Sequence, residues 1–160
     1  MDKAALHSAL IRQLEADLEL QTRAAMTSRE EAIDEESKPE NKYDMHAQEA
    51  AYLAQGQAKL VAELRETLVH YQALELATFG PETPIEVGAL VTLRAPDGAE
   101  RRYFVGPKAG GLEVVLGETV ILVVTPASPL GRQLIGRRRG DSVLLPGKTG
   151  ATSQQITDVT

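Results

Sequence analysis

Glycine and proline are distributed very unevenly along this chain of 160 residues. Residues 1–78 contain one proline, Pro39, and one glycine, Gly56, whereas residues 79–160 contain twelve glycines and seven prolines. Both residue types interrupt helices and favour turns. We therefore expect a helical segment over residues 1–78 and a separate, turn-rich domain over residues 79–160, with the boundary near Phe79–Gly80–Pro81.

The helical segment reads as two amphipathic helices. Leucine recurs every four residues from Leu6 to Leu18, which is typical of one helix face. Pro39 disfavours helix in the residue before it, so we expect a break near Ser37–Lys38–Pro39. The second apolar stripe consists of Leu53, Leu60, Leu64, Leu68, Tyr71 and Leu74. Two such stripes joined by a short loop predict an antiparallel coiled-coil hairpin whose tip lies near residues 34–44.

Residues 79–160 alternate apolar and polar side chains as strands do. Strands are predicted around residues 87–93, 103–105, 112–116, 119–124, 142–145 and 153–159. Between them, Ser128–Pro129 is a helix start, with serine as the N-cap and proline in the first turn, and Gly136 is expected to cap the other end. The predicted fold class is α+β, with a twisted antiparallel sheet and one short helix following the helical hairpin.

Composition excludes several classes of protein. The chain has no cysteine, so disulfides and thiolate metal sites are excluded. No apolar run reaches the roughly 20 residues of a membrane-spanning helix, so we expect a cytoplasmic protein without membrane contact. The formal net charge of −6 argues against independent binding to duplex DNA. Acid is concentrated in residues 1–78, where an electronegative element is expected.

The run Ser128-Pro-Leu-Gly-Arg-Gln-Leu-Ile-Gly-Arg-Arg-Arg-Gly-Asp141 resembles the signature of the GreA/GreB family of bacterial transcript cleavage factors. The domain order and the chain length are similar to that family as well. The resemblance implies an FKBP-like fold for residues 79–160. It also implies a polymerase-binding surface in this run, whose candidates are Ser128, Pro129, Leu130, Arg132, Arg137 and Arg138.

The resemblance further implies a function and its partners. Such factors bind RNA polymerase through its secondary channel, and the hairpin tip helps to hold a second Mg²⁺ ion near the 3′ end of the nascent RNA. The polymerase then cleaves its own backtracked transcript, so the factor has no active site and binds no cofactor alone. On this basis we expect a monomer that acts as an accessory factor, in bacterial transcription elongation, rather than as an enzyme.

The tip acids only partly match the family pattern Asp-x-x-Glu-Asn-x-x-Tyr. This chain reads Glu36-Ser-Lys-Pro-Glu40-Asn41-Lys-Tyr43. Glu40 and Asn41 match, Tyr43 comes one residue early, and the first acid is either Glu36, four residues before Glu40, or Asp34. The resemblance thus makes Glu36 and Glu40 the candidate ligands of the shared Mg²⁺, with Asp34 as the alternative acid and with Asn41 and Tyr43 in support.

Other interpretations of the same residues stay open. Seven acids within residues 30–44 are, taken alone, a solvated charged loop. A non-cleaving regulator of the same channel, or a coiled-coil module unrelated to polymerase, would carry similar features. Arg137–Arg138–Arg139 is either a solvent-facing turn, with Asp141 placed to pair with one arginine, or a contact for an acidic surface. Ser128 is better explained as a helix cap than as a nucleophile.

Overall fold

The computed structural model describes residues 2–36, 45–147 and 150–160, and they form two compact units. One unit is Ile11–Val69. The other combines the described residues up to Leu10 with His70–Thr160. The unit that contains the sheet therefore includes both the start of the first helix and the end of the second, which the sequence analysis assigns to the hairpin.

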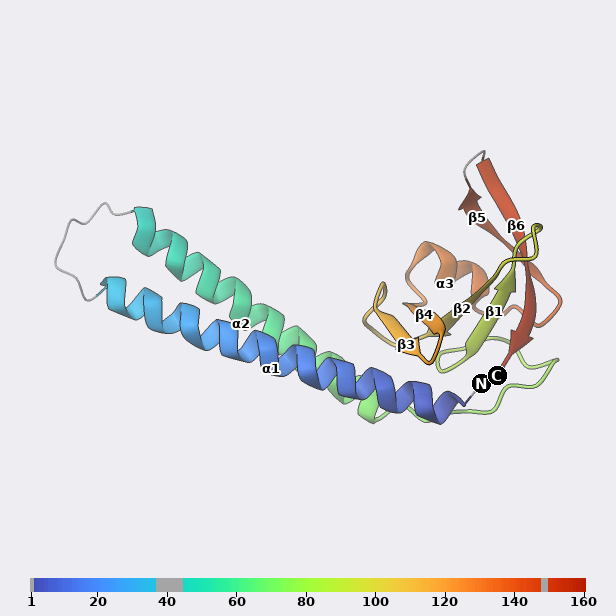
Figure 1. Ribbon diagram of the computed structural model, residues 1–160, viewed down its shortest axis with the longest axis horizontal. Helices are drawn as coiled ribbons and strands as arrows, with labels where there is room; N and C mark the ends of the chain where they lie inside the picture. The colour runs from blue at the N-terminus through green and yellow to red at the C-terminus, as the bar shows by residue number, and fades with distance from the viewer. Residues whose placement is uncertain (1, 37–44, 148–149) are drawn as a thin grey trace. The chain divides into compact units, whose positions relative to one another are not determined.

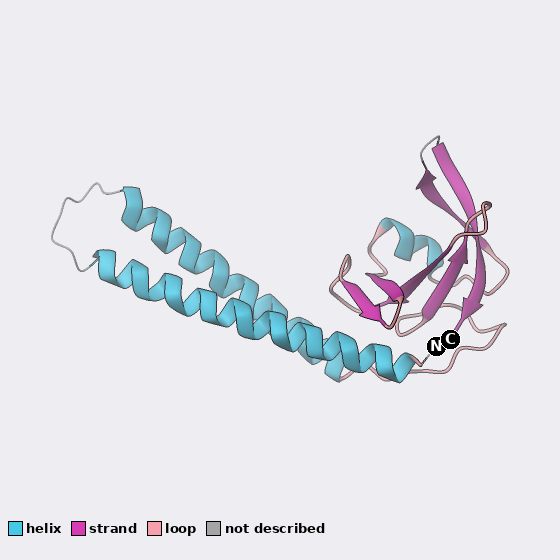
Figure 2. Ribbon diagram, in the orientation of Figure 1, coloured by secondary structure: helices cyan, strands magenta, loops and turns pink. Residues whose placement is uncertain are grey.

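Two long helices open the chain, α1 (Lys3–Glu36) and α2 (Met45–Gln72). Asp2 caps α1, because its Oδ1 accepts hydrogen bonds from the backbone N–H groups of Ala4 (2.9 Å) and Ala5 (3.3 Å). The two helices run alongside each other and draw apart toward their outer ends (Figures 1 and 2). This confirms the predicted pair of helices, while the predicted break at residues 37–39 lies outside the described residues.

The predicted apolar stripes are confirmed in α1 and only partly in α2. Leu6, Leu10 and Leu14 are buried. In α2, however, Leu53 and Leu60 are 55% and 40% exposed, so their predicted place in the stripe is wrong. The inward positions follow alternating steps of three and four residues, which is the helical seam of a coiled coil. That seam consists of Ala54, Gln57, Val61, Leu64, Leu68 and Tyr71, and it leaves Leu53 and Leu60 beside it.

The second part of the chain forms one six-stranded sheet. Its strands are β1 (Leu90–Arg94), β2 (Glu100–Val105), β3 (Glu113–Leu116), β4 (Thr119–Val124), β5 (Ser142–Gly147) and β6 (Gly150–Val159). The strand order is β3-β4-β2-β1-β6-β5. The short helix α3 (Pro129–Leu134) lies on one side of the sheet (Figure 1). The α+β class is confirmed, and the FKBP-like assignment stays a prediction.

One strand pair corrects the expectation of an antiparallel sheet. β2 and β4 pair in parallel, with Arg102 opposite Ile121 and Val105 opposite Val124. β3 and β4 form a tight antiparallel hairpin whose outer strand is the sheet edge, so β4 lies beside β2 and runs in the same direction. The sheet is therefore mixed.

Both faces of the sheet carry buried apolar side chains. On the face that α3 covers, Leu134 of α3 belongs to a core with Val91, Leu93, Tyr103 and Ile156. The opposite face buries Phe104, Ile121 and Val123. Tyr71, in the last turn of α2, contacts that second face: its hydroxyl donates to the Lys108 carbonyl (2.9 Å) and lies where a side chain on Gly106 would begin.

Within the described residues, no helix is both long enough and apolar enough to cross a membrane.

Candidate functional site

The turn before α3 confirms the predicted role of Ser128. Its Oγ accepts a hydrogen bond from the Gly131 N–H (3.0 Å) and donates one to the Thr125 carbonyl (2.7 Å). Pro129 follows in the first turn, where a missing N–H costs nothing. The serine therefore acts as a helix cap that joins the end of β4 to the start of α3.

Gly131 sets how closely α3 approaches this turn. A Cβ atom on Gly131 would lie 1.8 Å from the Thr125 carbonyl oxygen, a distance that no side chain tolerates. The backbone of α3 therefore packs directly on Thr125. A glycine inside a helix is unfavourable by itself, and here close packing requires it.

The end of α3 is joined to the segment before β1. Ile135 is the C-cap, and the predicted cap Gly136 follows it with φ +80°. The Gly136 N–H donates to the Ile85 carbonyl (2.9 Å), and the Ile85 N–H donates to the Arg137 carbonyl (2.8 Å). This two-way backbone pairing holds the loop that follows α3.

The arginine loop is held on both sides. The Arg138 guanidinium donates from Nε to the Glu82 carbonyl (2.8 Å), and the Arg138 backbone N–H donates to Asp141 Oδ2 (2.9 Å). The expectation that Asp141 pairs with an arginine side chain is therefore wrong, because its carboxylate satisfies a backbone donor of the turn. Beyond the turn, the Gly140 N–H donates to the Ile156 carbonyl of β6 (2.8 Å).

These contacts divide the candidate binding residues into two groups. Ser128, Leu130 and Arg138 are engaged by the domain itself, since Leu130 packs on the core. The exposed group consists of Pro129, Arg132 and Arg137, joined by Ile135 and Arg139, which the sequence analysis did not select. We call these five residues the α3 surface. It combines apolar and cationic side chains on α3 and on the firmly held loop that follows it.

Gln133 is a further residue that the sequence did not single out. Its side-chain amide donates to the Leu144 carbonyl (2.9 Å) and accepts from the Leu144 N–H (2.8 Å). The amide thus joins α3 to β5. Because β5 is an edge strand, the amide takes up backbone groups that a further strand would otherwise pair with. No sequence motif marks this role, because it depends on the placement of α3 beside β5.

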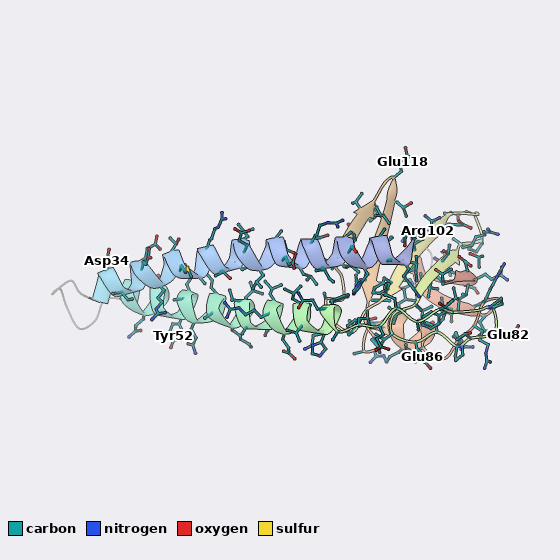
Figure 3. The ribbon with its side chains drawn as sticks, turned by 90° about the horizontal axis from the view of Figure 1, so that it is seen from below. Asp34, Tyr52, Glu82, Glu86, Arg102 and Glu118 are labelled. Atoms are coloured by element: carbon teal, nitrogen blue, oxygen red, sulfur yellow. The ribbon has the colours of Figure 1, made fainter. Side chains whose placement is uncertain are left out.

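The predicted tip residues fall largely outside the described part of the chain. Asp34 lies in the last turn of α1 and is exposed (Figure 3). Glu36 is the last residue of α1, and its side chain is not described. Glu40, Asn41 and Tyr43 lie outside the described residues. Within the residues described, no cluster of three His, Asp or Glu side chains could hold a metal ion.

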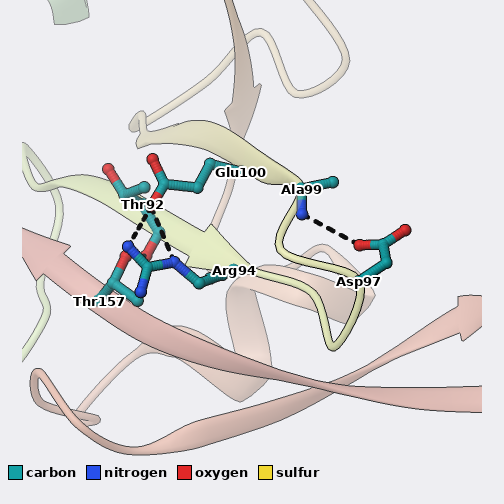
Figure 4. Close-up of polar contacts among 6 residues, drawn as sticks. All are labelled: Thr92, Arg94, Asp97, Ala99, Glu100 and Thr157. Atoms are coloured by element: carbon teal, nitrogen blue, oxygen red, sulfur yellow. Dashed lines mark hydrogen bonds and ion pairs between the residues drawn. The ribbon is translucent and has the colours of Figure 1, made fainter.

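Three charged side chains of the sheet, Arg94, Glu100 and Arg102, form hydrogen bonds with neighbours in the sheet. Arg94 donates from Nε (3.0 Å) and Nη2 (2.6 Å) to Glu100 Oε1, across the β1–β2 hairpin (Figure 4). Arg102 donates to the Thr119 hydroxyl (2.9 Å). All three charged residues border a polar pocket of about 240 Å³ that Arg139 and Asp158 also line. Side chains of both charges therefore line the pocket.

The fold and the site together define a class of protein. Its members have a pair of long helices followed by an α+β unit, and this unit exposes an apolar and cationic surface such as the α3 surface. No protein-family model matches the chain. The chain is 30% identical over 100 residues to the transcription elongation factors GreA of Xanthomonas axonopodis pv. citri and Xanthomonas campestris pv. campestris. Each match covers 62% of this chain and 60% of the relative. This chain thus spans about 60% of the length of these relatives. The chain is therefore similar to GreA transcription elongation factors over part of its length.

Solved structures show similarities of the same kind. GreA factor homolog 1 of Thermus thermophilus is 20% identical, with 94% of each chain covered and a TM-score of 0.38. The elongation factor GreA/GreB from Nitrosomonas europaea is 21% identical, with 66% of this chain and 79% of that chain covered and a TM-score of 0.38.

Proposed function

We propose that this protein is a transcription elongation factor that binds RNA polymerase through its secondary channel and stimulates cleavage of backtracked nascent RNA. The observation that supports this most is the identity with GreA factors over 100 residues, together with the signature at residues 128–141. The factor is an accessory protein, and the polymerase performs the chemistry.

In this proposal the α3 surface contacts the polymerase. Arg132, Arg137 and Arg139 are exposed, and none of their side chains makes a hydrogen bond or ion pair with the other described residues. Ile135, 39% exposed, supplies an apolar contact between them. Because the loop is held by Ser128, Arg138 and Asp141, little conformational entropy is lost on binding. Such a surface fits an acidic partner with an apolar centre.

The acids near the hairpin tip act in the polymerase active centre. We propose Glu40 and Glu36, with Asp34 as the alternative to Glu36, as the residues that contribute to a shared Mg²⁺. Carboxylate oxygens are ligands that magnesium accepts, and the ion would supply stabilisation of the attacking and leaving oxygens of the phosphodiester. Asn41 and Tyr43 would position these acids close to the RNA 3′ end.

A second function, a non-cleaving regulator of the same channel, is favoured by the spacing of the acids. Glu40 follows Glu36 by four positions, whereas the two acids of the family pattern are three positions apart, and glutamate replaces aspartate at the first acid. Metal-assisted reactions tolerate little displacement of their ligands. In this alternative, the acids occupy the channel and modulate initiation or pausing without assisting hydrolysis.

The experiment that tests both functions follows RNA length in stalled, backtracked elongation complexes. The first function predicts that shortened transcripts form when the protein is added. They should be lost with Glu40→Gln and with either Glu36→Gln or Asp34→Asn, whichever acid is the second ligand. Glu31→Gln is the matched control, since Glu31 is an exposed acid earlier in α1, and it should keep full cleavage.

Inhibited RNA synthesis without shortened transcripts would support the regulator instead. Absence of both effects, at protein concentrations that saturate binding to core RNA polymerase, would refute both functions.

A further inference from the structure

Large apolar side chains in the outer part of the hairpin face solvent. Within residues 20–36 of α1 and residues 48–60 of α2, every leucine, isoleucine, methionine and tyrosine whose side chain is described is exposed. These residues are Leu20, Met26, Ile33, Tyr52, Leu53 and Leu60. In the inner part, Leu14 and Val61 are buried, and Leu64 and Leu68 are half-buried. Burial of large apolar side chains therefore ends near Leu18 in α1 and near Val61 in α2.

The inward positions of the outer part hold small or polar side chains instead. Gln21, Ala24, Ala25, Ala50, Ala54 and Gln57 are half-buried there, and Ser28 is 7% exposed. The Gln57 Oε1 atom is buried without a hydrogen-bond partner in the described residues. A buried polar atom without a partner destabilises the closed state.

Three observations therefore agree that the outer helix pairing is weak. Apolar burial, the main favourable term in packing, is small there. An orphan amide oxygen opposes closure, and the ribbons of α1 and α2 separate toward their outer ends (Figure 1). In proteins, most helical stability comes from packing against neighbouring elements, so helix turns that separate from their partner helix also lose stability.

We propose that residues 20–36 and 45–60, here called the outer hairpin, open and close as a separate cooperative unit. Residues 11–18 and 61–69, here called the inner hairpin, and the sheet stay folded. Opening separates the outer turns of α1 from those of α2, and it moves Asp34 without a change in the rest of the molecule. The proposal concerns a conformational device of the hairpin and does not depend on the proposed function.

Hydrogen exchange of the full-length protein, followed by mass spectrometry, tests the proposal. Peptides from the outer hairpin should exchange at least tenfold faster than peptides from residues 11–18 and 61–69. Gln57→Leu, which replaces the orphan amide by an apolar group of similar size, should slow exchange of the whole outer hairpin about tenfold. Gln55→Leu changes an exposed residue two positions away and should leave exchange unchanged. Equal exchange in both parts, or equal effects of the two variants, would overturn the proposal.

Distances between spin labels provide a second readout, because the chain has no cysteine that would interfere. Labels at Glu30→Cys and Gln48→Cys, both exposed outer positions, should give a broad distribution that narrows with Gln57→Leu. Labels at Glu15→Cys and Ala62→Cys, exposed inner positions, should give a narrow one. A narrow distribution at the outer pair in the parent sequence would contradict the proposal.

Discussion

Ser128 shows how much of the candidate site depends on one hydroxyl group. It accepts from the Gly131 N–H and donates to the Thr125 carbonyl. Ser128→Ala should therefore lower the free energy of unfolding by about 1–2 kcal/mol, the usual cost of a lost cap. Urea denaturation measures the change. Ser142→Ala, at an exposed position of β5, is the control and should change stability by less than about 0.5 kcal/mol. Equal effects of the two substitutions would contradict the capping role.

Tyr71 makes the free energy of unfolding depend on pH in the alkaline range. Burial raises the pKa of its hydroxyl above the usual value, because the phenolate is poorly solvated there. The unfolded chain loses this proton near pH 10, while the folded chain retains it. The group's contribution to stability is thus complete below pH 10 and decreases as pH rises above it. Urea unfolding between pH 8 and 11.5 should show this decrease.

The variant Tyr71→Phe separates the contribution of the Tyr71 hydroxyl to this alkaline decrease from the contributions of other titratable groups. It should be less stable at pH 8, because the hydrogen bond to the Lys108 carbonyl is lost, and should show a smaller decrease above pH 10. Lys3 acts in the opposite direction: partial burial lowers its pKa, so its contribution to stability grows as pH rises toward 10.5. An identical alkaline decrease in Tyr71→Phe would contradict the assignment to Tyr71.

At the scale of elements, two helical glycines have opposite roles. Gly131 in α3 contacts the Thr125 carbonyl, whereas a Cβ on Gly56 in α2 would meet nothing within 4 Å. Gly131→Ala should destabilise the protein by about 1–3 kcal/mol or more through overlap. Gly56→Ala should stabilise it by about 0.5–1 kcal/mol, because alanine favours a helix. Thermal denaturation of both variants is the measurement, and the same sign for both would contradict the packing described for α3.

Elements with a strong local signal could be predicted from the sequence. The Leu6–Leu14 stripe and the Ser128–Pro129 helix start depend on neighbouring residues alone, and the structure contains both of them. The exposure of Leu53 and the parallel pairing of β2 with β4 depend on which partner lies opposite. Local sequence carries no information on that choice, so these features could not be predicted.

At the scale of the whole molecule, the candidate site was predictable only in part. Residues 128–141 were recognisable as a signature, and Ser128 was recognisable as a helix cap, yet the sequence did not separate Arg138, which holds the loop, from Arg132 and Arg137, which face solvent. That division arises from the contact of Arg138 with Glu82, which is distant in sequence. The tip acids Glu36 and Glu40 stay a prediction.

In the proposed function, the α3 surface binds RNA polymerase. The most direct test is the affinity of the fluorescently labelled full-length protein for core RNA polymerase, measured by anisotropy. The double variant Arg132→Glu and Arg137→Glu should weaken binding at least tenfold, since it reverses two exposed cations at the proposed contact. Arg101→Glu, at an exposed position of β2, should bind as the parent does. No binding by the parent, or equal weakening by both variants, would contradict the claim.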